Sequence, residues 1–364
     1  MRIAQVAPLF ESVPPKLYGG TERVVSYLTE ELVRMGHEVT LFASGDSETS
    51  ARLVPACGRA LWRDPECSET LPHHVRLMEM VFRESARFDV IHFHCDYLHY
   101  PFLRYHATAS VSTLHGMLRR HDLESLFEAY PDVPLVSISD DQRRPFPGAR
   151  WLATIHHGLP RNLHTYQPVP EDYLLFVGRV SPQKRLDRAI EIALRSGRHL
   201  KIAAKIYDED RAYHEAMIAP LLRRSKSQVE FLGEVGGRDK DRLMGGASAL
   251  LFPIDWPEPF GLVMIESLAC GTPVIAWPHG SVPEIVEHGR TGFVVETIDE
   301  AVRAVESAGQ IDRAACRRVF EERFDARQMA RQYEAVYQGL TQNGIPGMAP
   351  AYAAAPPSNG VVRG

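Results

Sequence analysis

The chain has 364 residues, of which 45% are hydrophobic and 24% charged, with a formal net charge of −5. This length allows two domains with full cores, and the near-balanced charge argues against a nucleic-acid partner. No apolar run approaches the roughly 18 to 20 residues of a membrane span, so we expect at most peripheral membrane contact. Five widely spaced cysteines, an odd number, favour reduced thiols and a cytoplasmic location.

Short apolar runs alternate with helical patterns through the first half of the chain, which predicts a parallel α/β domain. Gly19 and Gly20 lie between the first strand and the first helix, where bare backbone can approach a ligand, although a simple tight connection explains them equally well. The fingerprint GxGxxG is missing, which argues against a nicotinamide-dependent dehydrogenase. The expected strands are 3–7, 38–43, 90–94, 111–114 and 135–138, and the expected helices include 22–35 and 72–86.

The stretch 160–170 is rich in Pro, Arg and His and has little apolar periodicity, so we place a domain boundary there. The first domain is expected over 1–162 and the second over 163–324. An amphipathic helix at 325–340 follows the second sheet and needs a packing partner, for which the first domain is the candidate. Residues 341–364, dominated by Ala, Pro and Gly, are expected to form a disordered tail. The strands expected in the second domain are 173–178, 200–204, 229–232, 250–253, 273–277 and 293–295.

Basic side chains follow the first two strands of the second half. Arg179 and Lys184 come after the first of these strands, where two cations could hold a diphosphate, the alternative being a solvated basic turn. Lys205 ends the next strand and is either a further contact to diphosphate or sugar, or a lysine that faces water.

Two carboxylates bracket the start of a helix in the segment DWPEPFGLVMIESLACGTPVIA. We expect a helix over 263–269, so Glu258 lies before it and Glu266 within it. The N–H groups of Phe260, Gly261 and Leu262 would point out of the helix start, where they can bind hydroxyl or phosphate oxygens. Surface glutamates that only face water are the plainer explanation for either residue alone.

Several motifs together resemble the retaining glycosyltransferases of family 4, whose architecture is called GT-B. The resemblance implies an α/β fold with two Rossmann-like doubly wound domains facing across a cleft, and a C-terminal helix that crosses back to the N-terminal domain. It covers nearly the whole chain to about Leu340. The motifs are Gly19-Gly20, DVIHFH at 89–94, TLHG around His115, GRVSPQK at 178–184, EPFGLVMIE at 258–266 and the segment CGTPVIAWPHGSVPEIVEHGRTGFVV.

The resemblance also implies roles for these residues. Glu266 would bind the ribose hydroxyls and Glu258 the donor sugar, while His115 would touch the sugar near its 6-hydroxyl. Arg179, Lys184 and the N–H of Gly20 would neutralise the diphosphate, so that neither a metal nor a cofactor is expected. Backbone N–H groups of Phe260, Gly261 and Leu262 would reach the sugar. The segment Glu234, Val235 and Gly236 would border the base.

The sequence departs from the family pattern at IHHGLP, residues 155–160, where His157 and Pro160 replace the usual Asn and Asp; this affects hinge geometry more than catalysis. The acidic run 208–210 favours a polar helix start over a metal site. We therefore expect transfer of a sugar from a nucleotide-diphosphate donor, UDP-glucose above others, to a saccharide, a lipid-linked sugar or a small molecule. A nucleotide-sugar epimerase and a nucleotide-sugar binding protein without turnover are the alternatives.

Overall fold

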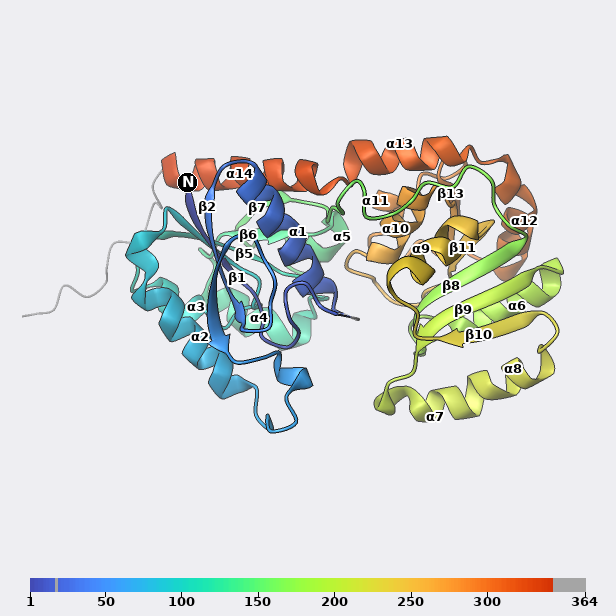
Figure 1. The fold of residues 1–364 in the computed structure, drawn as a ribbon, viewed down its shortest axis with the longest axis horizontal. Coiled ribbons are helices and arrows are strands. Elements are labelled where there is room, and N and C mark those ends of the chain that lie inside the picture. Colours follow the sequence, from blue (N-terminus) through green and yellow to red (C-terminus); the bar gives the residue numbers. More distant parts are fainter. Residues whose placement is uncertain (17–18, 343–364) are drawn as a thin grey trace, which may run out of the picture.

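The computed structural model describes residues 1–16 and 19–342, and it contains two parallel sheets that lie side by side (Figure 1). The seven strands of the first sheet follow the order β3-β2-β1-β4-β5-β6-β7. The strands of this sheet are β1 Arg2–Val6, β2 Glu38–Ser44, β3 Arg52–Cys57, β4 Val90–Phe93, β5 Ala109–Thr113, β6 Leu135–Ser137 and β7 Trp151–Thr154. The helices are α1 Gly20–Arg34, α2 Leu71–Arg83, α3 Tyr100–Leu103, α4 Arg120–Ala129 and α5 Asp140–Arg143, with short 3₁₀ turns at Leu61–Arg63 and Ser85–Arg87.

The second sheet has six strands in the order β10-β9-β8-β11-β12-β13. Its strands are β8 Tyr173–Arg179, β9 His199–Lys205, β10 Val229–Gly233, β11 Ala249–Phe252, β12 Val274–Ala276 and β13 Gly292–Val294. The helices of this half are α6 Leu186–Ser196, α7 Arg211–Tyr213, α8 Ala219–Arg224, α9 Gly237–Gly246, α10 Leu262–Cys270, α11 Val282–Ile285, α12 Ile298–Ser307 and α13 Arg313–Arg323. Short turns of 3₁₀ type lie at Asp208–Asp210 and Ala308–Gln310, and a π turn at His214–Ile218.

Both sheets are entirely parallel, and their central strands are buried on both faces, as β1 and β11 show. Near-continuous apolar runs are the pattern that such strands require, because helices cover both sides of the sheet. The structure confirms the predicted α/β class with two Rossmann-like domains. The domain limits at 162 and 324 stay predictions. No helix in the described part of the chain is both long and apolar enough to traverse a bilayer.

The last helix, α14 (Ala326–Gln342), packs against α1, β4 and β5 of the first domain, over which it runs in Figure 1. Met329, Tyr333 and Tyr337 on its apolar stripe are buried, as the sequence predicted. The helix continues two residues beyond Leu340, the predicted end. The remainder of the predicted tail, 343–364, lies outside the described residues.

The chain crosses between the two sheets twice, and the two crossings pair with each other. Leu159 donates its N–H to the carbonyl of Phe324 at 2.9 Å, and the N–H of Ala326 returns to the carbonyl of Leu159 at 2.9 Å. Apolar contact continues across this junction, because one core cluster includes Tyr27 of α1 together with Phe260 beside α10. Predicted site residues follow the carboxyl ends of several strands, as expected for open parallel sheets. These strands include β1, β5, β8 and β11.

Candidate functional site

Each cation that the sequence marked as a diphosphate contact has a carboxylate partner. Lys184 forms an ion pair with Glu258, and the indole N–H of Trp256 donates to the same Glu258 oxygen at 2.9 Å. The Lys184 ammonium also lies 5.3 Å from the ring centroid of Phe252 and 5.3 Å from that of Trp256. Both charged side chains are mostly buried, at 19% and 12% exposure, so the pair is shielded from water. Lys184 and Glu258 therefore share one site.

Arg179 and Lys205 end neighbouring strands and are held by acidic residues beyond them. Arg179 pairs with Asp210 and with Glu209, the latter at 2.8 Å, and its guanidinium lies over Tyr207. Hydrogen bonding to Asp210 is the main reason that the pKa of Arg179 is raised. Two residues of the acidic run 208–210 thus neutralise this arginine, a role beyond that of the polar helix start that we expected.

Lys205 lies 3.5 Å from Glu234, with both side chains about one-third exposed. Val235 follows in the loop between β10 and α9. Lys205 thus contacts a residue that was predicted to border the base. Its predicted contact to diphosphate or sugar stays a prediction.

Helix α10 begins one residue earlier and ends one residue later than predicted. Gly261 precedes it in the left-handed conformation (φ 77°), and a Cβ there would come within 2.8 Å of Met264. Gly271 closes the helix, again in the left-handed region. The first N–H groups of an α-helix have no intrahelical acceptor, so the start at Gly261 and Leu262 can bind oxygen atoms as expected.

Glu266 is buried within α10 and accepts a hydrogen bond of 2.6 Å from Lys240 of α9. Burial raises the pKa of Glu266, but the positive charge of Lys240 outweighs burial, and the pKa lies below its usual value. The carboxylate is therefore ionised and can accept hydrogen bonds from ribose hydroxyls. Lys240 was not predicted as a site residue, because nothing in its local sequence separates it from the other charges of that helix.

A loop after β12 holds the segment that carries Glu258. Ser281 donates its backbone N–H to the carbonyl of Glu258 at 2.9 Å and its hydroxyl to the carbonyl of Phe260 at 2.6 Å. Gly280 has φ 60°, and a Cβ on it would overlap the backbone of Glu258. Gly280 is thus a site residue that the sequence did not single out. Its only signal was a glycine that follows a buried strand.

His115 follows β5, and its side chain contacts residues that pack next to the start of α10. Its Nε2 lies 2.9 Å from Nδ1 of His94, and its ring centroid lies 5.2 Å from that of His157. His157 in turn packs edge-on against Phe260, at 4.8 Å between centroids. Burial lowers the pKa of His115 to about 3, so its imidazole is neutral. His157, noted above only for the hinge, lies between two predicted site residues.

The glycine pair also reaches the second domain. Gly19 immediately precedes α1 and Gly20 is its first residue. A Cβ on Gly20 would lie 3.9 Å from Cδ1 of Leu262, the first residue of α10. The beginnings of the two helices therefore face each other, and the structure brings Gly20 and Leu262 together as the predicted site requires.

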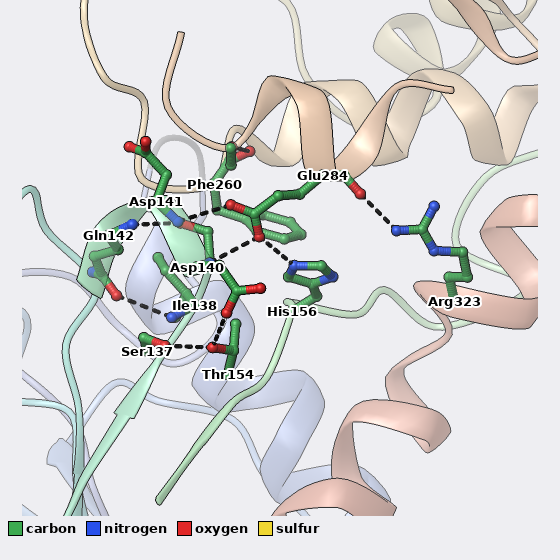
Figure 2. A network of polar contacts seen from close by, with 12 residues as sticks. Ser137, Ile138, Asp140, Asp141, Gln142, Thr154, His156, Phe260, Glu284 and Arg323 are labelled. Carbon is green, nitrogen blue, oxygen red and sulfur yellow. Dashed lines mark hydrogen bonds and ion pairs between the residues drawn. The ribbon is translucent and has the colours of Figure 1, made fainter. Parts of the chain in front are cut away.

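Glu284 of α11 joins the two domains through a network of polar contacts, which Figure 2 shows from close by. Its carboxylate accepts the backbone N–H groups of Asp140 at 2.8 Å and Asp141 at 2.9 Å, both at the start of α5, and contacts Nε2 of His156 at 3.0 Å. Arg323 donates to the carbonyl of Glu284 at 2.6 Å. Burial raises the pKa of Glu284, but the hydrogen bonds from His156, Asp140 and Asp141 outweigh burial, so the pKa lies below its usual value and the group is ionised.

One group of side chains could offer ligands to a metal ion. His164, Asp241 and Cys270 each have a ligand atom within 4.8 Å of the others. The same atoms already form hydrogen bonds, because Asp241 accepts from the N–H of Thr165 at 3.0 Å and lies 3.1 Å from Nδ1 of His164. The carboxylate of Asp241 is thereby satisfied within the protein, and these contacts lower its pKa to about 2.

Comparisons with known proteins agree with this geometry. Residues 166–320 match the family model of the glycosyl transferases group 1, and residues 18–176 match that of Glycosyltransferase Family 4. A glycogen synthase of Mycobacterium tuberculosis is 26% identical, over 89% of this chain and 92% of its own length. The solved structure of AviGT4, a glycosyltransferase involved in avilamycin A biosynthesis, is 27% identical with a TM-score of 0.70, covering 93% of this chain and 98% of that chain.

A further solved structure, Anabaena HepE in complex with UDP and glucose, shares the fold. Its TM-score is 0.70 at 19% identity, over 93% of this chain and 100% of that chain. The two family models together extend from residue 18 to residue 320, which includes every strand except β1 and all the predicted site residues. The chain belongs to the group 1 glycosyltransferases of the GT-B fold.

Proposed function

We propose that this glycosyltransferase transfers glucose from UDP-glucose to a hydroxyl of a saccharide, a lipid-linked sugar or a small molecule, with retention at the anomeric carbon and without a metal. One observation carries the proposal: Lys184 pairs with Glu258, and Glu258 lies next to Gly261 at the start of α10. A carboxylate that is held by a cation can accept sugar hydroxyls, while the cation and the helix N–H groups attract a diphosphate.

HepE, which has the same fold, was solved in complexes with UDP and with UDP-glucose. UDP-glucose is therefore the first donor to test. Glu266 fits the nucleotide half of such a donor, because an ionised carboxylate accepts both hydroxyls of a ribose.

In the reaction that we propose, the bond between the anomeric carbon and the diphosphate oxygen breaks while the acceptor oxygen bonds to the same face. The acceptor proton passes to the departing phosphate. We favour this same-face route over a double displacement because Glu258 and Glu266, the carboxylates assigned to the donor, are expected to hold its sugar and its ribose rather than to attack the anomeric carbon. Lys184 would stabilise the negative charge that develops on the diphosphate.

The donor is tested by calorimetry against UDP, GDP and ADP sugars, followed by tracing of the isotope-labelled sugar of any donor that binds. Transfer to an acceptor with the anomeric configuration kept supports the proposal. An isomerised donor would instead indicate an epimerase, and tight binding without turnover a binding protein. Activity that persists in a chelator is expected, and strict dependence on Mg²⁺ or Mn²⁺ would overturn the metal-independent part.

A further inference from the structure

A chain of buried polar side chains runs through the first domain from helix α14 to His115. The amide nitrogen of Gln5 in β1 donates to the hydroxyl of Tyr337 at 3.1 Å. The amide oxygen of Gln5 lies 2.9 Å from Nε2 of His94, and Nδ1 of His94 lies 2.9 Å from Nε2 of His115. Gln5, His94 and Tyr337 are all at most 3% exposed, so water cannot substitute for any of these partners.

The direction of each hydrogen bond follows from the chemistry of the groups. The carbonyl oxygen of Gln5 can only accept, so the ring proton of His94 is on Nε2. Burial, reinforced by the neighbouring imidazoles, lowers the pKa of His94 far below its usual value, and the ring is neutral. Its Nδ1 is then a bare acceptor, which receives the proton that His115 carries on Nε2. Since His115 is neutral as well, its own Nδ1 is left with a lone pair.

A second set of contacts holds Gln5 in this orientation. The hydroxyl of Tyr337, which accepts from the Gln5 amide, lies 2.7 Å from Nδ1 of His92 and donates to it. Nε2 of His92 then donates to the hydroxyl of Thr113 at 2.7 Å, which contacts the hydroxyl of Tyr333 at 2.9 Å. All these hydrogen bonds agree with one orientation of the Gln5 amide, in which its nitrogen donates to Tyr337 and its oxygen accepts from His94. Turning the Gln5 amide over would reverse all of them and would place the proton of His115 on Nδ1.

The nitrogen at the free end of this chain is Nδ1 of His115. Among residues 1–16 and 19–342, no hydrogen-bond partner lies at Nδ1 of His115, although the atom is buried. Buried polar atoms are nearly always hydrogen-bonded, so this acceptor is available to a bound group that supplies a proton. In the described part of the chain, Nδ1 of the neighbouring His157 is also buried without a partner. His115 is at the junction of the domains, in contact with His157 and through it with Phe260.

We propose that Gln5, acting through His94, is a positioning residue that fixes the tautomer of His115, with the proton on Nε2 and with Nδ1 as the acceptor for a substrate hydroxyl. A sugar or acceptor hydroxyl that donates its proton would be recognised, whereas a group that can only accept would meet a lone pair. The tautomer rests on the hydrogen-bond chain between two neutral rings and not on the identity of the donor. The identification of the hydroxyl with the donor sugar rests on the proposed function.

The tautomer can be read directly from the ¹⁵N resonances of the histidine rings in the enzyme without substrate, with His115 assigned by its loss in His115→Gln. We expect Nδ1 of His115 to resonate as a bare, pyridine-type nitrogen and Nε2 as a protonated one. A protonated Nδ1 would overturn the proposal. Because no substrate is present, this measurement gives its answer whether or not UDP-glucose is the donor.

Two variants test whether Gln5 sets the tautomer. Gln5→Met keeps a similar volume but removes both hydrogen bonds, and we expect the His115 resonances to shift toward a mixture of tautomers. Tyr333→Phe is the matched control, because it removes a buried hydroxyl from the same network beyond Tyr337, and the His115 resonances should not change. An unchanged His115 spectrum in a folded Gln5→Met protein would refute the role of Gln5. If Gln5→Met does not fold, the wild-type spectrum still decides the tautomer.

A substrate series tests the hydroxyl. Wild-type enzyme should prefer UDP-glucose over its 6-deoxy analogue by about 10-fold or more in kcat/KM, because the analogue leaves the acceptor nitrogen unpaired. In Gln5→Met this preference should shrink toward unity while the analogue is still used. A merely structural role for Gln5 would lower both activities and keep their ratio, which would contradict the proposal. If no UDP-sugar is a substrate, the proposed function fails while the nitrogen resonances still report on Gln5.

Discussion

Lys184 and Glu258 are 74 residues apart in the sequence and form an ion pair at the carboxyl end of the second sheet. The Glu258 carboxylate neutralises the Lys184 ammonium, and the ammonium holds the carboxylate in place near Phe260. A diphosphate that approaches Lys184 therefore competes with Glu258, and sugar hydroxyls can satisfy the carboxylate in exchange. Two side chains for which separate roles were predicted are thus coupled by one ion pair.

Replacing Lys184 by Met should lower kcat/KM by a factor that corresponds to about 2 to 4 kcal/mol of lost transition-state stabilisation. The reason is that the positive charge is lost where negative charge develops on the leaving group. Steady-state kinetics with the donor identified by calorimetry give the measurement. Lys226→Met, at an exposed lysine of the same domain, is the control and should behave as wild type. Unimpaired turnover in the Lys184 variant would remove the diphosphate assignment.

Replacing Glu266 by Ala should weaken nucleotide binding much more than it slows turnover at saturating donor. The carboxylate has its partner in Lys240, and both groups lie within the second domain. Loss of hydrogen bonds to a charged group typically costs about 1.5 to 3 kcal/mol. Calorimetric titration with UDP measures the change. Exposed Glu230→Ala in the same domain should leave the affinity unchanged, and an equal loss in both variants would argue against the ribose role.

The fold of both domains could be predicted because central parallel strands are buried on both faces and therefore appear in the sequence as apolar runs. The strands that were missed, β3 and β7, are the edges of the first sheet. Their residues are only partly buried, and β3 contains Pro55, which is tolerated at an edge but weakens the strand pattern. The returning helix was predictable for a different reason: its apolar stripe had no partner in the second domain.

The site was predictable where function depends on residues close in sequence, as in the segment from Glu258 to Glu266. It was not predictable where a role depends on a partner brought by the fold. Lys240, Gly280 and His157 have no local pattern that marks them, and only the packing of separate strands places them beside Glu266, Glu258 and His115. The pairing of Arg179 with Asp210 was hidden for the same reason.

A buried carboxyl at the start of α1 predicts how stability changes with pH. Glu22 is 5% exposed, and burial is the main cause that raises its pKa from 4.5 to about 7. Below pH 4.5 both the folded and the unfolded chain hold the proton. Between pH 4.5 and 7 only the folded chain keeps it, so the free energy of unfolding falls as the pH rises through this range. The difference between 4.5 and about 7 corresponds to at most ~3 kcal/mol.

Glu22→Gln should therefore unfold at higher urea concentration than wild type at pH 8, and the loss of stability between pH 4.5 and 7 should become smaller. Urea titrations at pH 5 and pH 8 provide the comparison. Glu48→Gln changes an exposed glutamate of the same domain and should reproduce the wild-type dependence. If Glu22→Gln shows the wild-type pH dependence, the carboxyl does not titrate as its burial indicates.

Glu284 predicts a separation of binding from turnover, because its carboxylate contacts Asp140, Asp141 and His156 of the first domain. Its carboxylate fixes the start of α5 through the N–H groups of Asp140 and Asp141 (Figure 2). In Glu284→Ala these N–H groups lose a charged acceptor, at a cost of about 1.5 to 3 kcal/mol, and the two domains lose a contact that sets their relative position. We expect lower kcat, unchanged affinity for UDP, and a larger radius of gyration in solution scattering.

Glu287→Ala is the matched control for this change. Glu287 lies three residues further along the chain and pairs with Arg290 and Arg323, both of the C-terminal half, so its loss removes a carboxylate without loosening α5. Calorimetry with UDP separates the two possible failures of Glu284→Ala. Weakened nucleotide binding would mean that the variant damages the second domain itself, whereas unchanged kcat and scattering would mean that Leu159, Phe324 and the apolar junction suffice to hold the domains in register.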